Sequence, residues 1–155
     1  MDEMDWALLR ELQADARLSY SELSRRVHLS APAVAERVRR LEQSGVVTGY
    51  HAHVDRARAG WSVLAIIQMA CYGSACVLRD PAVAGWPEVL EIHRVTGDTC
   101  SLLKVAAGSM DAFEGVIDRL APYGRPSSTM VLSTPLPWRP VTPAPAGDFD
   151  TIEQD

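Results

Sequence analysis

The chain has 155 residues, of which 47% are hydrophobic and 23% are charged, and its formal net charge is −5. This length is enough to bury a core in one domain or in two small ones. No stretch approaches the roughly 18 consecutive apolar residues of a membrane span, and the acidic N-terminus has neither the basic nor the apolar region of an export signal. We therefore expect no membrane association. The three cysteines are odd in number and lack metal-ligand spacing, so we expect free thiols in a reducing cytoplasm.

The first predicted element is a helix from Asp5 to Ala14, with an Asp as candidate N-cap. Its apolar residues recur at helical spacing: Trp6, Leu8, Leu9 and Leu12. A second, short helix is predicted after the capping-box pattern of Ser19 and Glu22. Its apolar side chains, Leu23 and Val27, are expected to point inward.

A longer third helix is predicted from Ser30 to about Ser44, because Ser30 is a good N-cap and Pro32 falls in the first turn. Gly45 is a natural stop. The apolar stripe of this helix consists of Val34, Val38 and Leu41. The opposite face carries Pro32, Glu36, Arg39, Arg40 and Gln43, with Arg37 on the flank. Residues 46–54 follow as a predicted strand of the kind that forms the wing of a winged helix.

Two short helices joined by a tight turn, the second with arginines outward, are what a reader of the DNA major groove requires. The negative net charge does not oppose this, because arginines balance the acidic residues up to residue 60 and the acidic excess lies beyond it. The alternative is a solvated helix face in which Glu36 and Glu42 pair with the arginines. We predict double-stranded DNA as a partner, contacted by Ser30, Ala31, Pro32, Glu36, Arg37, Arg39 and Arg40. Arg37 equally fits a salt bridge within the domain.

Beyond a polar hinge at residues 55–60 the pattern changes. Strands are predicted at residues 61–72, 89–96, 99–106 and 127–134, and helices at residues 74–84, interrupted by Pro81, and 109–120. The order β-α-β-β-α-β is that of the ferredoxin-like split motif. Its helices cover one face of the sheet, and dimerisation is the simplest cover for the other. From Pro135 onward we expect a proline-rich, acidic tail without a core of its own, in which Trp138 pins the first part to a neighbouring surface.

The sequence resembles the Lrp/AsnC family, the feast/famine regulators of bacteria and archaea, over about residues 2–134. The resemblance is carried by several short segments, among them Arg37-Val38-Arg39-Arg40-Leu41-Glu42, Gly45-Val46-Val47, Gly49-Tyr50 and Val95-Thr96-Gly97-Asp98. It implies an α+β protein with a winged helix-turn-helix at residues 1–54, a hinge at 55–60, a ferredoxin-like effector-binding and dimerisation domain at 61–134, and a tail at 135–155. It also implies homodimers, which in some members form octamers, a cytoplasmic location at the nucleoid, and a small-molecule effector that is usually an amino acid.

The resemblance places the effector between protomers, near the turn that joins the second and third strands of the small domain. Backbone N–H groups at a glycine turn can hold a carboxylate, and Asp98 can hold an ammonium group. Family members commonly carry a second Asp at the position of Cys100, so this departure indicates a different ligand or none. The predicted effector-binding residues are His93, Gly97, Asp98, Thr99 and Cys100. The alternatives are a plain hairpin turn, a satisfied strand histidine at position 93 and a small buried hydrophobe at position 100. Cys71 and Cys76 form a disulfide only if the backbone allows it.

No catalytic residue, cofactor or metal site is predicted, because no Ser-His-Asp spacing, phosphate loop or paired metal motif stands out. One alternative function is an enzyme, since a group of haem-pathway decarboxylases resembles the same two-domain architecture. Those enzymes use histidines in the small domain, whereas His93 is the sole histidine after residue 53. The other alternative is an assembly or corepressor module with a vestigial helix-turn-helix.

Overall fold

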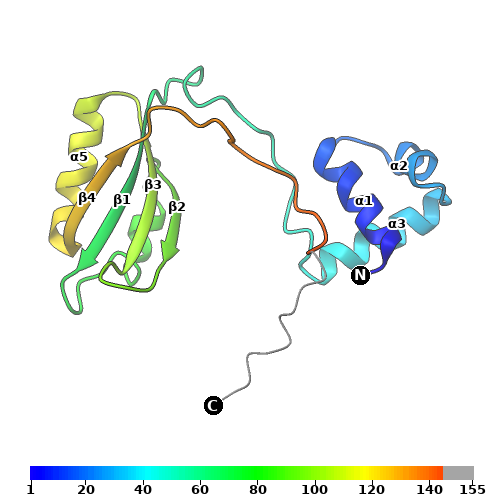
Figure 1. The fold of residues 1–155 in the computed structure, drawn as a ribbon, viewed down its shortest axis with the longest axis horizontal. Helices are drawn as coiled ribbons and strands as arrows, with labels where there is room; N and C mark the ends of the chain where they lie inside the picture. Colours follow the sequence, from blue (N-terminus) through cyan, green and yellow to red (C-terminus); the bar gives the residue numbers. More distant parts are fainter. Residues whose placement is uncertain (145–155) are drawn as a thin grey trace, which may run out of the picture. The chain divides into compact units, whose positions relative to one another are not determined.

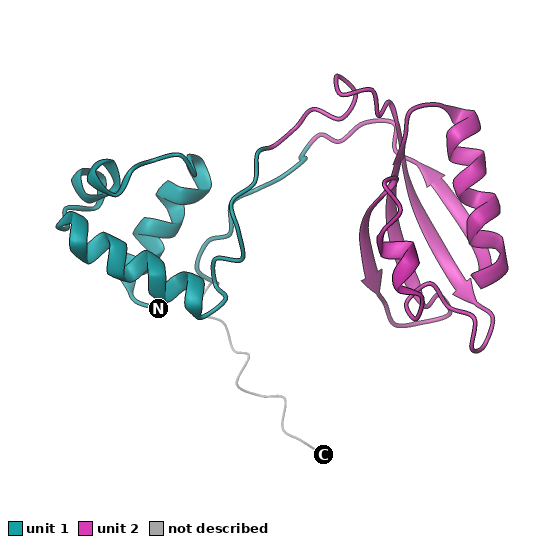
Figure 2. Ribbon diagram, turned by 180° about the vertical axis from the view of Figure 1, so that it is seen from behind, with its two compact units in different colours: residues 1–52, 136–155 teal, residues 53–135 magenta. Residues whose placement is uncertain are grey.

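The computed structural model describes residues 1–144 of the chain (Figure 1). It divides into two compact units, one formed by residues 1–52 with 136–155 and one by residues 53–135 (Figure 2). The acidic end of the predicted tail, residues 145–155, lies outside the described residues. Every helix of the described part is too short or too polar to span a lipid bilayer.

Unit 1 contains three helices, α1 (Glu3–Ala14), α2 (Tyr20–Val27) and α3 (Ala31–Gln43). Their apolar stripes meet in one buried cluster, which consists of Leu8, Leu12, Leu23, Val27, Val34 and Val38. The three predicted helices are thus confirmed. Helix α1 begins earlier than predicted, because its N-cap is Asp2. The Asp2 carboxylate accepts a hydrogen bond from the Asp5 N–H at 2.8 Å, and the Asp5 carboxylate accepts one from the Asp2 N–H at 3.0 Å.

The predicted strand at residues 46–54 is wrong, since this segment forms neither strand nor helix. Its first residues close the end of α3, because the N–H groups of Val46 and Val47 both donate to the Leu41 carbonyl at 3.0 Å. Gly45 permits this turn with a φ of 74°. A strand also needs a neighbour to satisfy its backbone, and unit 1 contains no strand among the described residues.

Unit 2 follows the predicted order β-α-β-β-α-β. Its elements are β1 (Val63–Cys71), α4 (Pro81–Ala84), β2 (Val89–Arg94), β3 (Ser101–Ala107), α5 (Met110–Leu120), the 3₁₀ helix η1 (Ala121–Tyr123) and β4 (Gly124–Met130). The strands form one antiparallel sheet in the order β2-β3-β1-β4, which confirms the ferredoxin-like topology.

The core of unit 2 lies between one face of the sheet and the two helices. Buried side chains on alternate strand positions, such as Ile67 and Leu103, pack with Val83 of α4 and Phe113 and Val116 of α5. The opposite face of the central strands carries two cross-strand pairs, Ile66 with Lys104 and Gln68 with Leu102. None of these four side chains is fully buried. The sheet is therefore covered by helices on one face only, as the sequence predicted.

Three details of unit 2 correct the sequence prediction. Residues 74–80 are not helical, and Pro81 begins the short helix α4 instead of interrupting one, since proline fits the first turn and Asp80 caps it. The tight turn at Gly97-Asp98 is a longer loop, because Arg94 pairs with Ser101 across the strands. Strand β4 begins at Gly124, ahead of the predicted strand at residues 127–134.

The described part of the tail, residues 136–144, belongs to unit 1. The side-chain amide of Gln13 donates to the Val141 carbonyl at 3.0 Å and accepts from the Val141 N–H at 2.7 Å. Residues 140–143 also line a cavity of about 420 Å³ together with side chains of α1 and the end of α2. The backbone of Val141 thus anchors this part of the tail to α1. The absence of a core in the tail and the anchoring role of Trp138 stay predictions.

Candidate nucleic-acid interface and effector cavity

The three residues between α2 and α3 set the angle between these two helices. His28 adopts a left-handed conformation, with a φ of 54°, and the Leu29 N–H donates to the Ser24 carbonyl at 3.0 Å. Ser30 then caps α3, because its hydroxyl oxygen accepts from the Ala33 N–H at 3.3 Å. This is the helix-turn-helix arrangement that the sequence predicted, with α3 as the second helix.

The outward face of α3 carries most of the predicted DNA-contact residues. Pro32, Glu36, Arg39 and Arg40 are exposed, and Ala31 is half-buried at the start of the helix. Arg39 pairs with Glu36 one turn earlier, and both side chains remain more than half exposed. Surface pairs of this kind contribute little to folding, so the Arg39 guanidinium can exchange Glu36 for a phosphate or a base at small cost.

Arg37 is held more tightly than Arg40, whose guanidinium lies 3.6 Å from Asp5 and whose side chain is 56% exposed. The Arg37 guanidinium lies 2.7 Å from the carboxylates of both Asp2 and Asp5, and its side chain is 25% exposed. Burial alone raises the pKa of Asp5, but hydrogen bonds from the Asp2 N–H and from Arg37 outweigh burial and hold this pKa below its ordinary value. The two ion pairs of Arg37 hold α3 against the N-terminus of α1. The structure thus brings Arg39 and Arg40 to the exposed face and ties Arg37 into unit 1.

The C-terminal end of α3 holds an interaction that sequence reasoning missed. The Tyr50 hydroxyl donates to the Glu42 carboxylate at 2.8 Å, and burial together with this bond raises the pKa of Tyr50 to about 12. Tyr50 therefore stays protonated and binds the segment after α3 back to the helix. The resemblance included Gly49-Tyr50, but nothing in the spacing indicated that this tyrosine contacts Glu42.

In unit 2, the predicted effector residues Gly97, Asp98, Thr99 and Cys100 line one open cavity of about 520 Å³. Gly97 has a φ of 103°, so the loop needs a glycine there. His93 is not part of the cavity lining. It is exposed on β2, and its Nε2 lies 3.0 Å from Glu91, which also binds Lys104 at 2.7 Å. The structure thus brings four of the five predicted residues together and separates His93 from them.

Residues that sequence reasoning missed line the same cavity, namely Cys71, Cys76, Arg79 and Arg94. They come from the end of β1, the following loop and the end of β2, whereas the predicted residues come from the loop before β3. Strands β1 and β3 are neighbours in the sheet, with Met69 opposite Ser101, and this pairing joins the two segments. No local pattern in the sequence carries that information.

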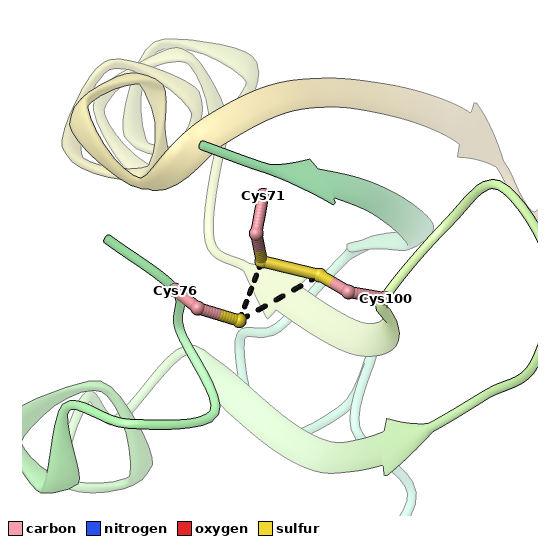
Figure 3. Close-up of side chains that lie close together, drawn as sticks. All are labelled: Cys71, Cys76 and Cys100. Atoms are coloured by element: carbon pink, nitrogen blue, oxygen red, sulfur yellow. Dashed lines mark hydrogen bonds between the residues drawn. A yellow bond between two sulfur atoms is a disulfide. The ribbon is translucent and has the colours of Figure 1, made fainter. Parts of the chain in front are cut away.

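The cysteines also correct the sequence prediction. Cys71 and Cys100 are joined by a disulfide, and Cys76 is a free, buried thiol (Figure 3). The Sγ of Cys76 lies 2.6 Å from that of Cys71 and 3.7 Å from that of Cys100. Three free thiols were therefore the wrong expectation, and Cys100 is half-buried in the bridge instead of being an isolated hydrophobe. The reason is that β1 and β3 bring together cysteines that are 29 residues apart.

Two family models match the chain. The AsnC-type helix-turn-helix domain matches residues 1–42, and the Lrp/AsnC ligand binding domain matches residues 80–141. The first match covers α1, α2 and all of α3 but its last residue, and the second includes the loop with Gly97 and Asp98.

The similar proteins are named as transcriptional or leucine-responsive regulators. An HTH-type transcriptional regulator of Mycobacterium tuberculosis is 38% identical over 139 residues, which cover 86% of this chain and 93% of the relative. The HTH-type transcriptional regulator LrpC of Bacillus subtilis is 32% identical, over 86% of this chain and 92% of the relative. The leucine-responsive regulatory protein of Salmonella typhimurium is 37% identical, over 76% and 73%.

Solved structures agree with these relatives. The structure of B. subtilis LrpC matches with a TM-score of 0.82 at 31% identity and covers 86% of this chain and 96% of that one. A transcriptional regulator of Neisseria meningitidis, solved as a complex with L-Met, also matches with a TM-score of 0.82 at 31% identity, over 91% of this chain and 96% of that one.

Proposed function

This chain belongs to the Lrp/AsnC family of transcriptional regulators, and we propose that it binds operator DNA with α3 and senses an amino acid or a related metabolite in the cavity of unit 2. The domains of the proposal are residues 1–54 for DNA binding, 55–60 as hinge and 61–134 for effector binding and dimerisation. Acting on chromosomal DNA, the protein works in the cytoplasm at the nucleoid.

The observation that carries the DNA proposal is the pair of exposed arginines, Arg39 and Arg40, on a helix whose other side is buried in a closed core. The major groove is about 12 Å wide and admits one helix, and guanidinium groups bind phosphates or guanine bidentately. The N-terminal residues Ser30, Ala31, Pro32 and Glu36 are assigned to base edges. Arg37 is assigned to positioning α3, because its guanidinium lies 2.7 Å from the carboxylates of both Asp2 and Asp5 and its side chain is 25% exposed.

The DNA proposal is tested by a footprint of the purified protein on the DNA upstream of its own gene, with and without the twenty amino acids. We expect protection at helically phased intervals that shifts when the effector is present. The logarithm of DNA affinity falls linearly with the logarithm of salt concentration. If Arg40 contacts phosphate only, Arg40→Ala should make the slope of this line shallower by about one. Absence of binding to any DNA at low salt would contradict the proposal.

Charge in the cavity supports an amino acid as the effector class. Asp98 offers a carboxylate for an ammonium group, while Arg79 and Arg94 line the same cavity and offer guanidinium groups for a carboxylate. The L-Met complex of the N. meningitidis regulator supports this class. Isothermal titration with each amino acid tests it, and Asp98→Asn should weaken binding of the one that binds.

A homodimer is the assembly we propose, with a second copy on the uncovered face of the sheet. Ile66 and Leu102 are apolar side chains at the centre of this face and are only half-buried. Two recognition helices held by such a dimer would reach successive major grooves, and association of dimers would give octamers. Light scattering that finds only monomers would rule this arrangement out.

We assign no catalytic role to the chain. The relatives are named as regulators, and His93 is exposed, paired with Glu91 and outside the cavity lining. A purified protein that turns over a tetrapyrrole and loses this activity in His93→Ala would favour the enzyme alternative.

A further inference from the structure

All three cysteines of the chain meet at one point of unit 2. Cys71 ends strand β1, Cys76 lies in the following loop, and Cys100 stands just before strand β3. Their sulfur atoms lie within 4.8 Å of one another (Figure 3). A disulfide needs two sulfur atoms, and this arrangement supplies a third, which is 91% buried against them.

From this convergence we propose that the reduced cysteine cluster binds one thiophilic metal ion of the Cu(I) type through three thiolates. Three thiolates about 2.3 Å from a shared ion lie about 4 Å apart. Reduction frees Cys71 from its bond to Cys100, and its sulfur, 2.6 Å from that of Cys76, has to move outward to reach this spacing. Cys76 and Cys100 already stand 3.7 Å apart. Thiolates select soft ions such as Cu(I), whereas Mg²⁺ and Ca²⁺ require oxygen ligands.

The coordination number follows from the donor set. The group of potential ligand atoms within 4.8 Å contains sulfur only, and no His, Asp or Glu of the described residues joins it. Structural Zn²⁺ sites almost always use four protein ligands in a tetrahedron, so this cluster is one ligand short for Zn²⁺. Three sulfur atoms suit an ion that accepts three-coordination, which is the chemistry of Cu(I).

The protein backbone already holds two of the ligands, Cys71 and Cys100, and Cys71 is held in β1 opposite Gly124 of β4. The Cys100 N–H donates to the Met69 carbonyl at 2.8 Å, and this bond keeps the start of β3 against β1. Cys76 lies just past a turn closed by the bridge between Tyr72 and Ala75, so its loop is the part that adjusts. The three cysteines are among the residues that line the open cavity of about 520 Å³, which gives an ion access from solvent.

Reduction precedes binding. The Cys71–Cys100 disulfide accepts two electrons and two protons from a dithiol reductant and becomes two thiols, while the reductant becomes a disulfide. Binding of Cu(I) then releases up to three protons, one from each thiol. The cluster thus has an oxidised form without a metal site and a reduced form with one.

The binding test uses the full chain, reduced with a phosphine and handled without oxygen. A thiol count of three per chain under denaturing conditions confirms the starting state. Cu(I) is then titrated against a coloured Cu(I) chelator. We expect one ion per chain, a new near-ultraviolet thiolate-to-metal absorption and, by X-ray absorption, three sulfur neighbours. No Cu(I) taken from the chelator by the fully reduced protein, or only two sulfur neighbours, would overturn the proposal.

Cys76→Ser separates a metal site from a disulfide, because it leaves Cys71 and Cys100 able to bridge. Changes outside the first ligand shell already weaken metal binding by about 10- to 100-fold, so losing this ligand should weaken Cu(I) binding by at least about 100-fold. Ser74→Ala, an exposed change in the same loop, is the matched control and should bind as the wild type does. Equal Cu(I) affinity of Cys76→Ser and wild type would contradict the three-thiolate site.

The regulatory consequence rests on the proposed function, because the ion would act through the effector cavity. DNA binding of the reduced protein is therefore measured with and without one equivalent of Cu(I), and we expect a change in affinity that Cys76→Ser abolishes. A protein that binds DNA but not Cu(I) retains the proposed function and loses this inference. A protein that binds Cu(I) but no DNA retains the metal site and loses the proposed function.

Discussion

Units 1 and 2 differ in how far each encloses its own apolar surface. The three helices of unit 1 enclose their apolar residues in one cluster, and the residues proposed to read DNA stand on the outer surface. In unit 2 the sheet is covered on one face only, and a cavity opens beside the end of β1. Unit 1 therefore carries its proposed DNA-contact residues on the surface of a closed core. Unit 2 keeps an uncovered sheet face and an open cavity, where we propose that a second copy, an effector or an ion binds.

The largest expected effects on the free energy of unfolding come from substitutions in the two cores. They test whether the two units unfold independently. Leu8→Ala in unit 1 and Leu103→Ala in unit 2 each remove a fully buried leucine and should each lower the free energy of unfolding by about 2–5 kcal/mol. Hydrogen exchange resolved by segment should show the loss of protection in the mutated unit. Equal loss in both units would contradict the division that we describe.

A smaller effect separates the two sides of α3. Arg37→Ala leaves the Asp5 carboxylate, which is 7% exposed, without its main partner, and should lower the free energy of unfolding by about 1–3 kcal/mol. Arg39→Ala removes only an exposed pair and should change it by less than about 0.5 kcal/mol while weakening DNA binding. Urea unfolding and DNA titration of both variants measure the contrast. A destabilised Arg39→Ala with intact DNA binding would reverse the two assignments.

Acid should weaken unit 1 through the same ion pairs. Hydrogen bonds from the Asp5 N–H and from Arg37 lower the pKa of Asp2, and the pKa of Asp5 is also lowered in the folded state. Lowered folded values mean that both carboxylates stabilise the fold above their unfolded pKa of about 3.9, and that this contribution is lost as the pH falls through the folded values. Circular dichroism during acid titration measures the loss. Asp5→Asn should flatten this part of the profile, and an unchanged profile would show that the pair is not responsible.

The smallest effect concerns the tail. Gln13→Ala removes two exposed hydrogen bonds to Val141 and should cost less than about 1 kcal/mol in the free energy of unfolding. It should nevertheless release residues 140–143 from α1, which faster proteolysis of this segment would report. Gln43→Ala, an exposed glutamine at the end of α3, is the control and should leave cleavage unchanged. Equal cleavage of both variants would show that Gln13 does not hold the tail.

The helices of unit 1 were predictable because their signals are local. Apolar residues three and four positions apart define a helix face, and Ser19, Glu22 and Ser30 mark where helices begin. The prediction of a wing strand was wrong because it too relied on local signals. Valine is common in strands, but the N–H groups of Val46 and Val47 donate to the Leu41 carbonyl instead of to a neighbouring strand. Propensity describes a residue, whereas a strand also requires a neighbour.

By itself the sequence determined the helix-turn-helix, the order of strands and helices in unit 2, the exposed arginines of α3 and the place, though not the length, of the connection at Gly97. Each of these depends on residues close together in the chain. Only the tertiary structure decided that Arg37 is tied to Asp2 and Asp5, that His93 lies outside the cavity and that the three cysteines meet. These contacts join residues far apart in sequence, and strand pairing and helix packing bring such residues together because they bury apolar surface and satisfy the backbone.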